Sequence, residues 1–201
     1  MTCGSAILCV ALTFAALQSG NAQESRRKPG DPLPTKGTAD LYVTPNPRDI
    51  PATLKDLVDR STLIVDGTVT KTYPSRETSP GALETDAIID VADVIKGPKA
   101  IQKVAISQRG GSKDGIVINP VQYSLVEPGT RCLWFLTDDK RPDAPPLDSV
   151  SRYFVTGAWS GMLCVENDKI QVRARQPDRF RLRYQGQTLE QVKSEVQSVL
   201  H

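Results

Sequence analysis

Paired carboxylates are the first feature of this sequence with the chemistry for catalysis. Glu84 and Asp86 stand two positions apart, so a β-strand would place both on one face, where one acts as a general acid and the other as a general base. Carboxylates at this spacing are also common on the solvent face of strands. The pair leaves a hydrolase that uses carboxylates alone as an alternative, whereas we expect no catalytic residue and no enzyme.

Histidine and metal chemistry have little support in the sequence. The only histidine, His201, is the last residue, where it cannot be held in a catalytic triad or a zinc site. The aspartates between residues 138 and 148 lack the spacing of a calcium-binding loop, and basic residues and prolines stand among them. We interpret this segment as a solvated loop and expect neither a metal nor a cofactor.

Alternating arginines are the most distinctive polar pattern. Arg179, Arg181 and Arg183 alternate with apolar or aromatic residues, which predicts a strand with three guanidinium groups on one face. Such a face keeps an edge strand soluble, or it binds a polyanion such as lipopolysaccharide or an acidic glycan.

The two tryptophans are candidates for stacking on a sugar. Trp134 lies inside an apolar run and is expected in the core. Trp159 stands between Gly157 and Gly161 in a predicted loop and is the better candidate of the two for an exposed contact. The candidate binding residues are Trp159, Arg179, Arg181 and Arg183.

The chain that must position these side chains is predicted to be mostly β. The most apolar run after the N-terminus, residues 129–137, predicts a strand buried on both faces in the middle of a sheet. Residues 74–83 predict a loop, and Thr53 and Thr188 are suited to cap a short helix and a C-terminal amphipathic helix. β-Branched or alternating segments predict further strands near residues 62–70, 85–95, 103–107, 116–118, 153–155, 162–165 and 169–173.

The N-terminal quarter of the chain differs from this pattern. Residues 7–17 are apolar and uncharged and precede Gly20-Asn21-Ala22, so residues 1–22 are predicted to be a removed signal peptide, with a retained membrane anchor as the alternative. Residues 23–52 hold six prolines among charges and predict a disordered linker. Residues 53–201 are predicted to form a single domain, without stable membrane insertion after cleavage.

Charge and cysteine content agree with an exported protein. The 25 basic and 23 acidic residues give a net charge of only +2, so we expect no nucleic-acid partner. Removal of residues 1–22 leaves only Cys132 and Cys164, which can form a disulfide in an oxidising compartment. Two buried free thiols are the alternative.

The predicted elements describe a mainly β domain: a small Greek-key barrel of OB type, or a sandwich, with a short N-terminal helix and a C-terminal amphipathic helix. Five segments resemble a broad group of exported bacterial domains, and the resemblance implies an OB-type barrel related to netrin and tissue-inhibitor-of-metalloproteinase modules. These segments are Asp56-Leu57-Val58, Ser61 to Val69, Val91 to Gly97, Gly129 to Leu136 and Gly161 to Val165. Such inhibitors insert an N-terminal cysteine into a protease's metal site, whereas the predicted mature chain begins at Gln23.

The sequence therefore predicts a secreted or periplasmic, non-enzymatic domain that binds a protein or glycan partner outside the cytoplasm. A protease inhibitor that acts through its loops and the carboxylate-dependent hydrolase are the alternatives.

Overall fold

A computed structural model describes residues 40–43, 49–79, 81–120, 122–141, 146–157, 159–174 and 177–201. The predicted signal peptide lies outside the described residues, as does most of the predicted linker. Within the linker range the structure has a short strand, β1 (Asp40–Val43), which pairs in parallel with β7 (Ile116–Pro120).

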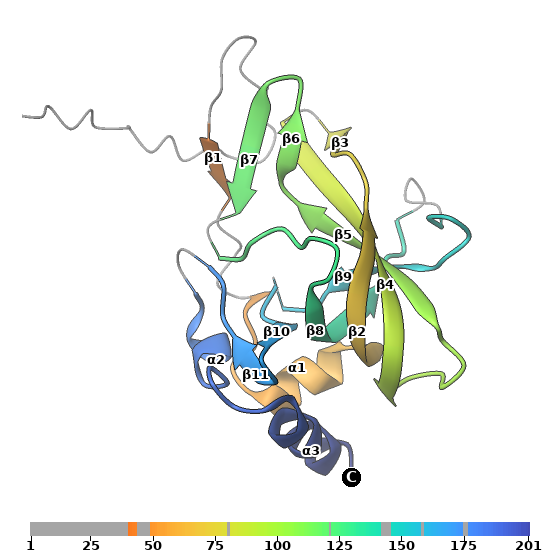
Figure 1. The fold of residues 1–201 in the computed structure, drawn as a ribbon, viewed down its shortest axis with the longest axis vertical. Coiled ribbons are helices and arrows are strands. Elements are labelled where there is room, and N and C mark those ends of the chain that lie inside the picture. Colours follow the sequence, from red (N-terminus) through yellow and green to blue (C-terminus); the bar gives the residue numbers. More distant parts are fainter. Residues whose placement is uncertain are drawn as a thin grey trace, which may run out of the picture.

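A closed barrel of five strands forms the centre of the domain (Figure 1). Each strand is hydrogen-bonded to the next, and the last pairs with the first to close the ring. The predicted mainly β fold is confirmed, and the barrel is compatible with an OB-like barrel. In ring order the strands are β2 (Leu63–Thr72), β4 (Ala82–Lys96), β5 (Lys103–Arg109), β9 (Arg152–Val155) and β8 (Arg131–Asp138).

Strand β8 lies in the middle of the sheet, as its apolar sequence predicts, and pairs with three other strands. Residues 132–136 are buried, with Trp134 facing the barrel interior and Phe135 the opposite side. One edge of β8 pairs with β2, and the other is shared between β9 and β10 (Met162–Glu166). Because β9 continues to β5 while β10 leaves the ring, the two strands part beside β8.

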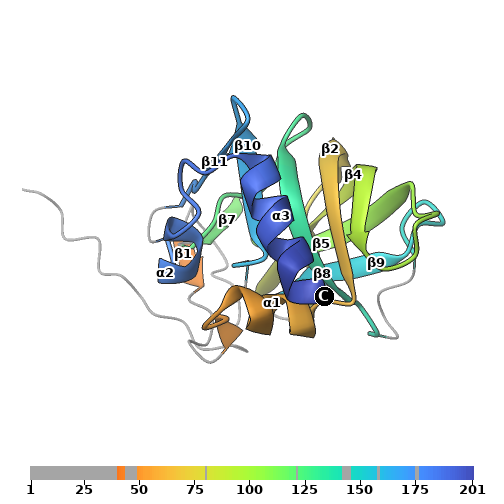
Figure 2. The ribbon, with the colours of Figure 1, turned by 90° about the horizontal axis from the view of Figure 1, so that it is seen from below.

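A second apolar core covers the outer face of β8 and contains all three helices of the described chain. α1 (Leu54–Arg60) is capped by Thr53, and α3 (Leu189–Leu200) begins with the predicted capping box of Thr188 and Gln191. The two helices lie side by side under the barrel (Figure 2). In the part of the chain that the structure describes, no helix has the length and apolar character needed to cross a membrane.

The remaining strands extend the barrel at its margins. β10 and β11 (Lys169–Gln171) form a hairpin, and its turn residues, Asn167 and Asp168, have positive φ. β6 (Gly111–Lys113) joins β7, and β3 (Arg76–Ser79) pairs with β4 inside the segment that was predicted to be a loop.

The predicted strand at residues 179–184 is wrong. This segment contains α2 (Arg179–Leu182), a short helix capped by the Asp178 carboxylate, which accepts the Arg181 N–H at 2.9 Å. Phe180 and Tyr184, four positions apart, both pack into the second core. Alternation would place Leu182 inward beside Phe180 and Tyr184, whereas the helix buries those two and leaves Leu182 48% exposed.

Candidate functional site

A cavity of about 510 Å³ lies between the segment 124–130 and the β10–β11 hairpin. Its apolar lining comes from Leu125, Val126, Pro128, Met162, Cys164 and Val165. Its polar and charged lining comes from Ser124, Glu127, Thr130, Glu166, Gln171, Arg173 and Arg181. The volume falls within the range of small-molecule and side-chain pockets.

The cavity exists because the segment 122–130 fills the space between β5 and β10. Gln108 on β5 lies inside the barrel, accepts a hydrogen bond from the Val126 N–H at 2.9 Å and donates to the Met162 sulfur at 3.8 Å. Tyr123 and Val126 pack into the barrel core, and the Tyr123 hydroxyl donates to the Arg109 carbonyl. The segment is therefore fixed to both flanking strands, and the cavity is left on its outer side.

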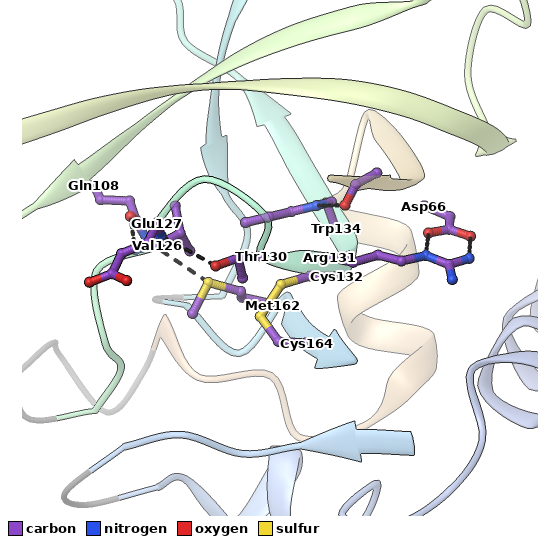
Figure 3. Close-up of a disulfide and its surroundings, with 11 residues drawn as sticks. Asp66, Gln108, Val126, Glu127, Thr130, Arg131, Cys132, Trp134, Met162 and Cys164 are labelled. Atoms are coloured by element: carbon purple, nitrogen blue, oxygen red, sulfur yellow. Dashed lines mark hydrogen bonds and ion pairs between the residues drawn. A yellow bond between two sulfur atoms is a disulfide. The ribbon is translucent and has the colours of Figure 1, made fainter. Parts of the chain in front are cut away.

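The predicted disulfide, drawn in Figure 3, borders this cavity through Cys164. Cys132 and Cys164 are directly opposed residues of β8 and β10, and the bridge joins them. Cys132 is fully buried, whereas Cys164 is half-buried and lines the cavity. The bridge ties the strand beneath the cavity to the most buried strand of the barrel.

A tight turn forms one rim of the cavity. The Thr130 N–H donates to the Glu127 carbonyl at 3.0 Å, and Gly129 has a φ of 90° after Pro128, the signature of a type II turn. The Glu127 N–H donates to the Thr130 hydroxyl at 3.3 Å. The Gly129 N–H donates to the Val69 carbonyl at 2.8 Å. Glu127 therefore stands on a backbone that is held from both sides.

The two arginines of the cavity are already paired. Arg181 forms an ion pair with Asp178 at 2.6 Å, and both side chains are almost fully buried. Arg181 also donates to the Gln122 carbonyl. Arg173 pairs with Glu166 at 2.7 Å on the exposed hairpin. Glu127 is exposed, and its carboxylate has no ion pair or hydrogen bond with the residues that the structure describes.

The structure does not bring the predicted binding residues together. Trp159 is 8% exposed and stacks on Tyr123 with ring centroids 4.1 Å apart, so the prediction of an exposed tryptophan is wrong. Arg181 is buried with Asp178, while Arg179 is exposed and Arg183 donates to the Ala52 carbonyl at 3.3 Å. The three arginines therefore do not form one face, and only Arg181 lines the cavity. Trp134 is in the core, as predicted.

The carboxylate pair lies on the barrel wall, away from the cavity. Glu84 and Asp86 are 4% exposed, and both form ion pairs with Arg76 at 3.0 Å. Arg141 adds a second partner for Glu84 at 2.9 Å, and Arg152 one for Asp86 at 2.7 Å.

These arginines favour the ionised form of the Asp86 carboxyl. Burial opposes ionisation of Asp86, but hydrogen bonds from Arg152, Arg76 and Ser107 outweigh it and hold the pKa of that carboxyl below 3.8. A general acid needs a carboxyl that is protonated near neutral pH, so this geometry favours a structural ion network over acid–base catalysis.

Sequence reasoning missed the cavity because three separate segments of the chain build it. The Glu127-Pro128-Gly129 signal marks a turn, but nothing local shows which strands the turn faces. In the described ranges no group of three or more His, Cys, Asp or Glu side chains is placed to hold a metal ion. No protein-family model matches the chain, and a comparison with curated proteins finds no match.

Proposed function

We propose that the protein is an exported, non-enzymatic binding module that holds an extended segment of a partner protein in the cavity beside the Cys132–Cys164 disulfide. The observation that carries this proposal is the cavity itself, which combines an apolar base with a rigid, polar rim. Pockets of this composition fix a ligand by apolar burial and orient it through a few polar groups.

The lining favours a protein segment over a glycan. Sugar rings are usually held by stacking on exposed aromatic side chains, and no aromatic residue lines this cavity among the described residues. Trp134 and Trp159 are both buried in the barrel core. Aliphatic and sulfur-containing side chains such as Leu125 and Met162 suit the aliphatic side chains of a peptide instead.

Two features support a site of action outside the cytoplasm. The sequence of residues 1–22 has the character of a signal peptide, and a disulfide persists best in an oxidising compartment. The closed barrel is compatible with the OB-like fold that the sequence resemblance implies. A loop-mediated protease inhibitor would be one form of such a binding module.

The proposal is tested by selecting peptide ligands on the wild-type protein and measuring their binding to a variant whose cavity is filled. A random-peptide phage library is panned on the purified, oxidised protein, and selected peptides are measured against Ser124→Trp. Ser124 lines the cavity with an exposed side chain, so an indole there occupies the space that a ligand needs. The matched control is Gln102→Trp, an exposed position outside the cavity lining.

We expect peptides that bind the wild type and Gln102→Trp with equal Kd and Ser124→Trp at least about tenfold more weakly. Peptides that bind all three proteins alike, or a panning that enriches none, would refute the proposal. A glycan array is probed in parallel. If a sugar binds the wild type but binds Ser124→Trp more weakly, and no peptide does so, the partner is a glycan and not a protein segment.

A further inference from the structure

We infer that the cavity selects a segment in which a lysine or arginine stands next to, or one position from, an aliphatic residue, with Glu127 receiving the cation. This inference rests on the proposed function and assigns the chemistry of its ligand. It follows from the charges of the rim, from the rigidity of the turn and from the spacing of the lining side chains.

One carboxylate that lines the cavity has no ion-pair partner among the described residues. Arg173 is neutralised by Glu166, and Arg181 by Asp178 behind the cavity wall. Only Glu127 has no counter-charge among the described residues. A ligand that brings a cation completes the pairing, whereas a ligand that brings an anion meets an unpaired like charge, which costs affinity.

The turn fixes the backbone that carries this carboxylate before any ligand arrives. The N–H groups of Val126, Glu127, Gly129 and Thr130 all donate to fixed acceptors in the barrel or within the turn. A charge on a rigid backbone loses less conformational entropy on binding than one on a free loop. The open side of the turn leaves room for the approach, since a Cβ added at Gly129 would meet no atom within 4 Å.

The spacing of apolar and acidic groups sets the ligand pattern. Leu125 and Glu127 both line the cavity and stand two residues apart, so their Cα atoms are separated by at most about 7 Å. Leu125, Met162 and Cys164 supply the apolar contact. A bound segment therefore places its cation within about two residues of the aliphatic side chain that fills the base.

The test compares peptides that differ in one charge. A selected peptide is synthesised with lysine, norleucine or glutamate at the position facing the rim, and Kd is measured for the wild type, Glu127→Gln and Glu127→Lys. We expect the wild type to prefer lysine over norleucine by about fivefold to tenfold, and this preference to shrink as salt is added. Glu127→Gln should bind the lysine and norleucine peptides equally, and Glu127→Lys should prefer glutamate.

A second variant controls for net charge. Asp114→Asn removes one negative charge from the exposed β6–β7 turn, away from the cavity, and should keep the lysine preference of the wild type. Equal binding of the lysine and norleucine peptides by the wild type, or an unchanged preference in Glu127→Gln, would overturn the inference. If peptides depend on Ser124 but show no charge preference, only this inference fails; if none depends on Ser124, the proposed function fails as well.

Discussion

Breaking the buried ion pair between Asp178 and Arg181 should destabilise the fold far more than breaking an exposed pair. Both side chains are at most 3% exposed, and the Asp178 carboxylate also caps α2. Asp178→Ser keeps an oxygen that accepts the Arg181 N–H but removes the charge. Among the described residues, the buried guanidinium then keeps only the Gln122 carbonyl as a partner, and we expect a loss of about 3–5 kcal/mol of unfolding free energy.

A double-mutant cycle separates the charge from the contacts. Arg181→Met keeps most of the buried volume and should also cost about 3–5 kcal/mol, because it leaves the Asp178 carboxylate buried without its cation. The double variant Asp178→Ser, Arg181→Met has no buried charge and should lie within about 1 kcal/mol of the wild type. The two single losses less the loss in the double variant give a coupling energy of at least about 5 kcal/mol, far above that of an exposed pair.

The assay is urea unfolding at 25 °C, followed by the fluorescence of the buried Trp134 and Trp159 and analysed by linear extrapolation. Glu166→Gln, which breaks the exposed pair with Arg173, is the matched control and should cost no more than about 1 kcal/mol. A cost below about 1 kcal/mol for Asp178→Ser would refute this reasoning. Water would then reach Arg181 through the cavity that it lines, and its charge would count toward the ligand site.

Three further predictions concern the barrel. Because the pKa of Asp86 is held below its unfolded value of 3.8, its contribution to stability is present above that pH and is lost as the pH falls through the lower folded-state pKa. Asp86→Asn should therefore weaken the acid dependence of the urea midpoint below about pH 4, and equal slopes in the variant and the wild type would contradict this. Replacing Cys132 and Cys164 together by alanine should lower the unfolding free energy by about 3–4 kcal/mol, since the bridge joins positions 32 apart. Unchanged unfolding of the double variant would show that the bridge does not restrict the unfolded chain. Gly67→Ala should cost about 1–3 kcal/mol, because its Cβ would lie 2.5 Å from Ile89 Cγ2 and 2.8 Å from the Asp90 carbonyl oxygen; an unchanged urea midpoint would mean that β4 moves aside freely.

The parts of the fold that sequence reasoning predicted are those that depend on local chemistry. The apolar run of β8 has few placements other than the middle of a sheet, and the Thr188–Gln191 capping box defines a helix start from four residues. The disulfide followed from elimination, because only two cysteines remain after the predicted cleavage. Each of these inferences needs no knowledge of distant neighbours.

The errors arise where a distant residue decides the outcome. Trp159 stands between two glycines in a turn, yet Tyr123 packs against its ring and buries it. The cavity likewise depends on how β9 and β10 part beside β8, which is a property of the closed sheet and of no single segment. The error at Arg181 is local instead: Asp178, three positions earlier, caps α2 and neutralises the arginine inside the domain, and the alternating pattern did not reveal this cap.

The position of β8 also sets the order in which the chain can fold. Its partners come from both directions along the sequence: Leu63 of β2 pairs with Leu136, and Val155 of β9 pairs with the same residue. The ring cannot close until residues 131–155 are available, so a large loop-closure entropy is lost before most of the core forms. A chain that stops before residue 131 would leave the apolar edge of β2 unpaired and open to association with other chains. Folding should therefore be slow, and the ring should close only after the chain has been made as far as Val155 of β9.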